Sequence, residues 1–198
     1  MLIQSELYDD GNYNKTDDRL TGDRGSYDQF MRSYNVLSSL SQTTFIQENG
    51  QNTFFMINNH TTHEPMTLQK LAYEPVFHET NNAEFDREHS TRTADDGSVF
   101  DLNTTWKKTH YDVNMATLIQ LGKWMDYLKE QGVYDNTRII IAADHGTHLD
   151  NPEFTAPKLR TALEPKYMNI LYYNPLYMVK DFGSEGALRT SGSIHDEC

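Results

Sequence analysis

A carboxylate and an imidazole stand side by side at the end of an apolar run, in the stretch IIIAADHGTHL of residues 139–149. Asp144 and His145 are side-chain types that bind Zn²⁺ or Mn²⁺, and Gly146 permits a sharp backbone turn at little steric cost. At the end of a strand, such a turn can bring both side chains onto one ion. The alternative is an ordinary turn in which Asp144 accepts backbone hydrogen bonds. The tripeptide alone fits both interpretations.

Two histidines three residues apart follow another apolar run, in the stretch NNHTTHEPM of residues 58–66. His60 and His63 could hydrogen-bond an oxyanion such as phosphate or sulfate, above all when they are protonated. The alternative is that both are ordinary surface residues of a loop. Among the other histidines, His148 is a further candidate metal ligand, and we interpret three as structural: His78, His89 and His110.

Several classes of site are excluded by what the 198 residues lack. There is no glycine-rich phosphate loop and no G-x-S-x-G nucleophile motif. The one cysteine, Cys198, allows neither an intrachain disulfide nor a cysteine-based zinc site. A net charge of −12 disfavours a nucleic-acid partner, because such proteins need a basic face. No apolar run approaches the roughly 20 residues that span a membrane, so the chain itself reads as soluble.

Helical periodicity appears twice in the sequence. Ser26 reads as the N-cap of a helix over about residues 26–40, because apolar residues recur behind it at helical spacing. A second helix is predicted for residues 110–131, with Gly132 in the C′ position after its end. The apolar stripe of this second helix consists of Val113, Leu118, Leu121, Trp124, Met125 and Leu128.

Three short apolar segments predict strands. Residues 52–60 and residues 139–143 each contain a continuous apolar run, which is typical of a strand buried on both faces. Residues 168–183 give a third strand region, which Pro175 breaks or bulges. The polar residues 70–105 form a long insert without clear periodicity, and inserts of this length tend to be binding loops or lids.

This order of elements predicts one α/β domain, in which helices cover both faces of a sheet. In sheets of this kind, ligands bind beyond the carboxyl ends of the strands. His60 and His63 follow the first predicted strand, and Asp144 and His145 follow the second. The sequence therefore places both candidate pairs at positions where a binding site is expected.

The motifs together resemble the sulfatase and alkaline phosphatase superfamily, and most closely its lipoteichoic acid synthase branch. The shared features are a strand leading into H-x-P at His63, the long insert, the amphipathic helix, and the segments DNTRIIIAADHG and NPLYMVKDFG. They cover about residues 50–183. The resemblance implies that residues 1–198 are a partial catalytic domain with an alkaline-phosphatase-like α/β sandwich, here incomplete.

The resemblance also implies roles for the two candidate pairs. It makes Asp144 and His145 ligands of a divalent metal ion, Mn²⁺ or Zn²⁺, with Mg²⁺ or Ca²⁺ as further options. It makes His63, and after it His60, contacts of the substrate's phosphate or sulfate group. The family's nucleophile, a Thr, a Ser or a modified Cys, has no recognisable counterpart in residues 1–50 and is expected upstream of this chain.

The function implied by the resemblance is metal-dependent hydrolysis or transfer of phosphate or sulfate esters. A covalent phospho- or sulfo-enzyme forms, and water or an acceptor alcohol then resolves it. In the lipoteichoic acid branch the donor is phosphatidylglycerol and the product is a glycerol-phosphate chain. The parent protein is expected to be anchored in the cell membrane with an extracellular catalytic domain. The fragment by itself is expected to be inactive.

Two rival functions stay open on the sequence. A non-catalytic α/β module that binds anionic cell-surface polymers would have Asp144 and His145 making structural hydrogen bonds and pointing apart. A metal-dependent nuclease or phosphatase of unrelated fold would need more carboxylates near Asp144, for which Asp150 and Glu153 are the nearest candidates.

Overall fold

Two compact units, Met1–Glu130 and Gln131–Cys198, make up the chain. The structure is a computed structural model, and it describes residues 24–46, 50, 52–76, 78–93, 97, 99–146 and 175–186. These residues contain four helices and four strands, and the strands form two small antiparallel sheets, so the fold is α/β in the broad sense. None of the helices in this part of the chain is long and apolar enough to cross a membrane.

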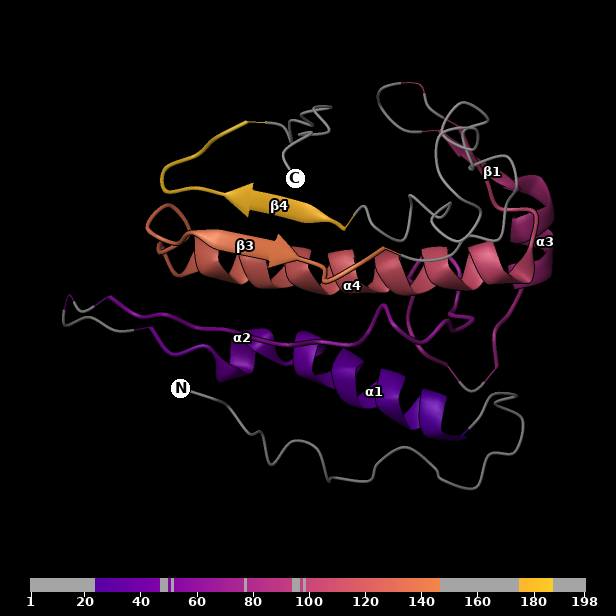
Figure 1. Cartoon of the computed structure of the whole chain (residues 1–198), viewed down its shortest axis with the longest axis horizontal. Coiled ribbons are helices and arrows are strands. Elements are labelled where there is room, and N and C mark those ends of the chain that lie inside the picture. Colours follow the sequence, from indigo (N-terminus) through magenta and orange to yellow (C-terminus); the bar gives the residue numbers. More distant parts are fainter. Residues whose placement is uncertain are drawn as a thin grey trace, which may run out of the picture. The chain divides into compact units, whose positions relative to one another are not determined.

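The first unit is built mainly on helices (Figure 1). The elements are α1 (Arg24–Ser38), α2 (Leu40–Thr43), α3 (Asn82–Glu88), β1 (Thr91–Thr93), β2 (Val99–Asp101) and α4 (Thr105–Glu130). Both predicted helices are confirmed, as α1 and α4. Since α1 begins at Arg24, Ser26 lies inside the helix and is not its N-cap. Gly132 follows the end of α4 with a φ of 70°, the left-handed conformation expected at a C′ position.

The core of this unit lies where α1 and α4 run side by side (Figure 1). The rings of Phe30 and Tyr34 on α1 stack with their centroids 5.7 Å apart. The Tyr34 hydroxyl accepts a hydrogen bond of 3.0 Å from Gln120 Nε2 on α4, in the interior. The buried members of this cluster are Phe30, Tyr34, Leu68, Tyr73, Val113 and Ala116.

The predicted apolar stripe of α4 is confirmed in part, since Val113 and Leu128 are buried. Leu118 is 45% exposed, although the periodicity placed it in the core. The face that packs inward runs through Thr109, Asp112, Val113, Ala116 and Gln120, which recur at helical spacing. Three of these five residues are polar, so the apolar periodicity identified only part of the buried face.

A buried ion pair joins α4 to the segment that precedes α3. Lys70 Nζ contacts Asp112 Oδ1, and both side chains are almost fully buried. Asp112 Oδ2 also accepts a hydrogen bond of 3.3 Å from the Leu68 backbone N–H. Asp86 on α3 lies 3.6 Å from Lys70 Nζ and 3.5 Å from Lys108 Nζ. Burial raises the pKa of the Asp112 carboxyl, and the hydrogen bond from Lys70 opposes that shift.

The polar residues 70–105 contain more regular structure than the sequence analysis predicted. Helix α3 and the antiparallel pair β1–β2 lie within them, with Arg92 paired to Phe100 at the centre of the register. Asn82 begins α3 and ties it to the preceding segment. Its Nδ2 donates to the Leu68 carbonyl at 2.8 Å, and its Oδ1 accepts from the Lys70 N–H at 2.9 Å.

The prediction of a buried strand at residues 52–60 is wrong. The described residues of this segment form no strand, and Phe54 and Met56 are 83% and 74% exposed. A strand needs a hydrogen-bonded neighbour, and no described segment pairs with this one. The apolar run predicted a strand from local sequence alone, which carries no information on a pairing partner.

The second unit contains β3 (Ile139–Ala142) and β4 (Tyr177–Lys180), which pair antiparallel from Ile139 opposite Lys180 to Ala142 opposite Tyr177 (Figure 1). Both predicted strands therefore exist, although only Ile139 of β3 is buried, so burial on both faces is not confirmed. Arg138 holds the far end of the pair through Asp181, with its Nε 2.9 Å from Oδ1. This hydrogen bond lowers the pKa of Asp181.

We expect Asp112→Ala to lower the free energy of unfolding by about 3–5 kcal/mol, because Lys70 would keep a buried charge without its main partner. Asp126→Ala is the control, since Asp126 is exposed and pairs with Lys129 at 2.8 Å on the helix surface. It should cost less than about 1 kcal/mol. Urea unfolding of both variants measures the difference. Equal midpoints for the two variants would contradict the importance of the buried pair.

We expect stability to fall as the pH drops below about 6.5, partly because of His110. His110 is buried, and burial lowers its pKa below the ordinary 6.5, while the hydrogen bond to the Trp106 carbonyl opposes the shift. The unfolded chain then binds the proton first, so acid favours unfolding, by up to about 1.4 kcal/mol per pH unit. His110→Gln should flatten this slope, whereas His78→Gln, at an exposed position, should not. Unfolding free energies measured at several pH values decide between them.

Candidate functional site

The two histidines of the first unit lie in a turn that is fastened to α1. Asn59 Nδ2 donates to the Ser33 carbonyl of α1 at 2.8 Å. Asn59 Oδ1 accepts from the backbone N–H of Thr61 at 3.0 Å and from its hydroxyl at 2.6 Å, and Thr61 is fully buried. The turn closes with a backbone hydrogen bond of 3.1 Å from His63 N–H to the His60 carbonyl. This arrangement fixes the backbone of both histidines while their side chains stay exposed.

The structure brings His60 and His63 together. Their ring centroids are 6.1 Å apart, with an angle of 41° between the ring planes. Both residues are exposed, so a ligand can approach them from solvent. The spacing suits two hydrogen bonds to one tetrahedral oxyanion, because each such bond spans about 2.8 Å between heavy atoms.

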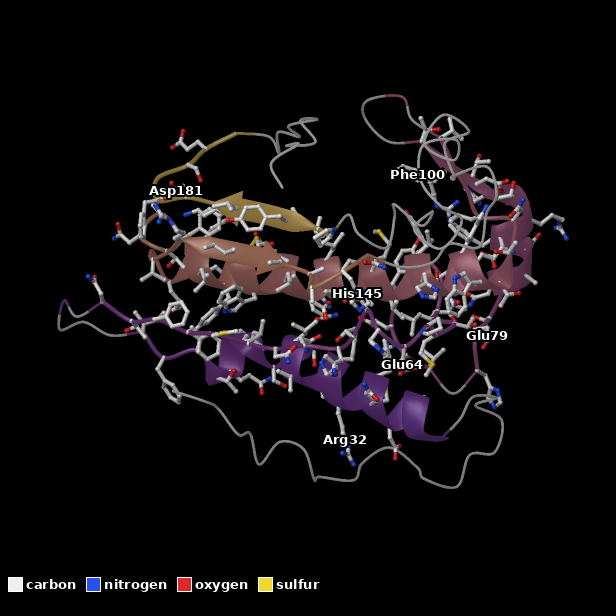
Figure 2. All side chains as sticks on the ribbon, viewed as in Figure 1. Arg32, Glu64, Glu79, Phe100, His145 and Asp181 are labelled. Atoms are coloured by element: carbon white, nitrogen blue, oxygen red, sulfur yellow. The ribbon has the colours of Figure 1, made fainter. Side chains whose placement is uncertain are left out.

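Each of these imidazoles has a side-chain partner at Nδ1. Gln29 Nε2 on α1 lies 3.5 Å from Nδ1 of His60. Glu64 Oε1 lies 3.0 Å from Nδ1 of His63, and Figure 2 labels Glu64 in this turn. Sequence reasoning missed both partners. Glu64 could have been found as the neighbour of His63, whereas Gln29 is 31 positions from His60 and carried no signal.

Asp144 and His145 lie just beyond the carboxyl end of β3, and Figure 2 labels His145 there. The Ala143 N–H donates to the Leu176 carbonyl at 2.9 Å, so the residue before Asp144 is held against the chain that leads into β4. Asp144 Oδ1 accepts the backbone N–H of His145 at 3.0 Å. The turn therefore contains the hydrogen bond to Asp144 that an ordinary turn would have. This hydrogen bond uses Oδ1 and not Oδ2.

The two side chains converge and do not point apart. His145 Nε2 is 3.8 Å from Asp144 Oδ2. His145 Nδ1 donates to the Gly146 carbonyl at 2.6 Å, which places the proton of the neutral ring on Nδ1 and the lone pair on Nε2. Two ligands at about 2.1 Å from one Zn²⁺ in tetrahedral geometry lie about 3.4 Å apart, close to the observed spacing. An oxygen and a nitrogen donor at this distance fit one divalent ion.

Within the part of the chain that the structure describes, no other candidate ligand adds to this pair. Among the described residues, no three His, Cys, Asp or Glu side chains are grouped closely enough to hold a metal ion. His89 and His110 make structural contacts instead, stacking on Phe85 and packing against Trp106 with centroids 4.2 and 4.1 Å apart. The remaining candidates lie outside the described residues: His148, Asp150 and Glu153.

Comparison with protein-family models finds no match to this chain, and searches of curated proteins and of solved structures find none either. The function is therefore argued from the two side-chain pairs themselves.

We expect Asn59→Ala to lower the free energy of unfolding by about 1–3 kcal/mol, because the buried Thr61 hydroxyl and the Ser33 carbonyl would both lose a partner. Asn58→Ala is the matched control at an exposed neighbouring position and should change stability by less than about 0.5 kcal/mol. Chemical denaturation measures both effects. Indistinguishable unfolding curves for the two variants would show that Asn59 does not anchor the turn.

Proposed function

We propose that this chain is part of a metal-dependent, sulfatase-like enzyme that hydrolyses or transfers phosphate or sulfate esters. The observation that carries the proposal is the 3.8 Å approach of His145 Nε2 to Asp144 Oδ2, directly after β3. In this proposal the surrounding domain is an alkaline-phosphatase-like sandwich. The parent protein is a membrane-anchored enzyme, for which phosphatidylglycerol is one possible donor substrate.

Asp144 and His145 would hold the divalent ion, Mn²⁺ or Zn²⁺, with one oxygen and one nitrogen. When bound, such an ion lowers the pKa of a nucleophile and stabilises negative charge on the group being transferred. The Gly146 carbonyl supports this role, because it fixes the His145 tautomer that leaves a lone pair on Nε2. Further ligands and the nucleophile would have to come from residues other than this pair.

His60 and His63 would bind the oxyanion of the substrate. Their fixed backbone limits the conformational entropy that ligand binding would cost. The chain carries a net charge of −12, which opposes the binding of an anion to these histidines. The rival binding module predicts that Asp144 and His145 point apart, and their convergence favours the metal-dependent enzyme over it.

We expect Mn²⁺ and Zn²⁺ to bind at Asp144 and His145, and binding to weaken at least about tenfold in Asp144→Ala/His145→Ala, because two donors are removed. The control is Asp135→Ala/His78→Ala, which removes the same two groups from exposed positions. Calorimetry measures affinity, and Mn²⁺ broadening of the amide signals of residues 143–146 detects weak binding. Equal affinity in both double variants, or no broadening at these residues, would overturn the assignment.

A further inference from the structure

We infer that His60 and His63 present opposite hydrogen-bonding groups to a shared oxyanion, so that the pair selects hydrogenphosphate over sulfate. The inference deepens the proposed function and rests on it, since it concerns the same oxyanion site. Among the substrates that the motifs leave open, it favours phosphate monoesters in their monoanionic form over sulfate esters, and it does not favour a phosphodiester such as phosphatidylglycerol, which has no P–OH group. It also assigns positioning roles to Gln29 and Glu64, which the sequence did not single out.

Gln29 sets the tautomer of His60. Its Nε2 amide group, 3.5 Å from Nδ1 of His60, can only donate a hydrogen bond. With the amide in this orientation, Nδ1 accepts, and the single proton of the neutral ring is assigned to Nε2. His60 then presents an N–H donor at Nε2, which suits a negatively charged oxygen.

Glu64 sets the opposite tautomer in His63. A carboxylate can only accept, and Glu64 Oε1 is 3.0 Å from Nδ1 of His63. The proton of the neutral ring therefore resides on Nδ1, and Nε2 carries a lone pair. His63 then presents an acceptor at Nε2, which suits a hydroxyl group.

Hydrogenphosphate matches this donor and acceptor together, whereas sulfate does not. Inorganic phosphate keeps one P–OH group near neutral pH, and a phosphate monoester does so in its monoanionic form, below a pKa of about 6. The P–OH donates to Nε2 of His63 while a charged oxygen accepts from Nε2–H of His60. Sulfate has no proton to donate, so its oxygen would face the lone pair of His63.

The negative charge around this site weakens the binding of both anions, so the expected signal is a difference in affinity between phosphate and sulfate rather than tight binding of either. Glu64 and the net charge of −12 repel any anion, so phosphate is expected to bind weakly. That repulsion acts on phosphate and sulfate alike. One unmatched hydrogen bond, by contrast, acts on sulfate alone, and a difference of about 1.4 kcal/mol is tenfold in affinity.

The first test reads the tautomers directly from the ¹⁵N chemical shifts of the imidazoles at about pH 8, above the ordinary histidine pKa of about 6.5. His60 should carry its proton on Nε2 and His63 on Nδ1. Inorganic phosphate should shift both ring signals at concentrations at least about tenfold lower than sulfate does. The same tautomer on both rings, equal responses to the two anions, or no response to either would overturn the inference.

A substitution that inverts one tautomer gives the second test. Gln29→Glu places an acceptor beside Nδ1 of His60, so the proton should move to Nδ1 and the preference for phosphate should fall at least about tenfold. Gln42→Glu adds the same charge at an exposed position on α2 and should change neither the tautomer nor the preference. Identical behaviour of the two variants would refute a positioning role for Gln29. No metal is added in these experiments, so they remain decisive whether or not Asp144 and His145 bind a metal ion.

Discussion

The contact of Lys70 with Asp112 is the constraint on which the described part of the first unit depends. Both charges are buried, so neither can be satisfied by water, and each must keep the other in place. The pair holds the segment around Lys70 against α4, and Asp86 adds α3 to the same network. Leu71 and Tyr73 in this segment have positive φ values of 71° and 50°, a conformation that persists only when surrounding contacts enforce it.

Buried polar groups also explain how an exposed site can be well positioned. The His60–His63 turn is tied to α1 by the Asn59 side chain, and the chain after it reaches the core at Leu68, whose N–H donates to Asp112. The chemistry-bearing side chains therefore contribute little to the core themselves. Their backbone is fixed on one side by the α1 carbonyl of Ser33 and on the other by the buried ion pair.

One principle links the two candidate pairs: the partner of Nδ1 decides what Nε2 can do. The Gly146 carbonyl leaves a lone pair on Nε2 of His145, as metal binding requires. Glu64 has the same effect on His63, whereas Gln29 has the opposite effect on His60. The type of residue supplies an imidazole in each case, and a neighbouring group selects donor or acceptor.

The features that the sequence alone determined depend on interactions between residues close together in the chain. Helices α1 and α4, the glycine that ends α4, and the positions of β3 and β4 could be predicted, because helical hydrogen bonds join residues four apart and strand propensity is carried by short runs. The candidate residues His60, His63, Asp144 and His145 could be named from their types and their places after apolar runs.

Tertiary structure alone decided which segments found partners. The apolar run at residues 52–60 has no described pairing neighbour and forms no strand, whereas β3 pairs with a strand that begins 35 positions after β3 ends, Ala142 against Tyr177. The buried face of α4 was fixed by Lys70 and Tyr34, which pair with Asp112 and Gln120 from distant parts of the chain. The contact of Gln29 with His60 likewise joins residues that are 31 positions apart in the sequence. Contacts between residues far apart in sequence leave no periodic pattern, so only the folded chain reveals them.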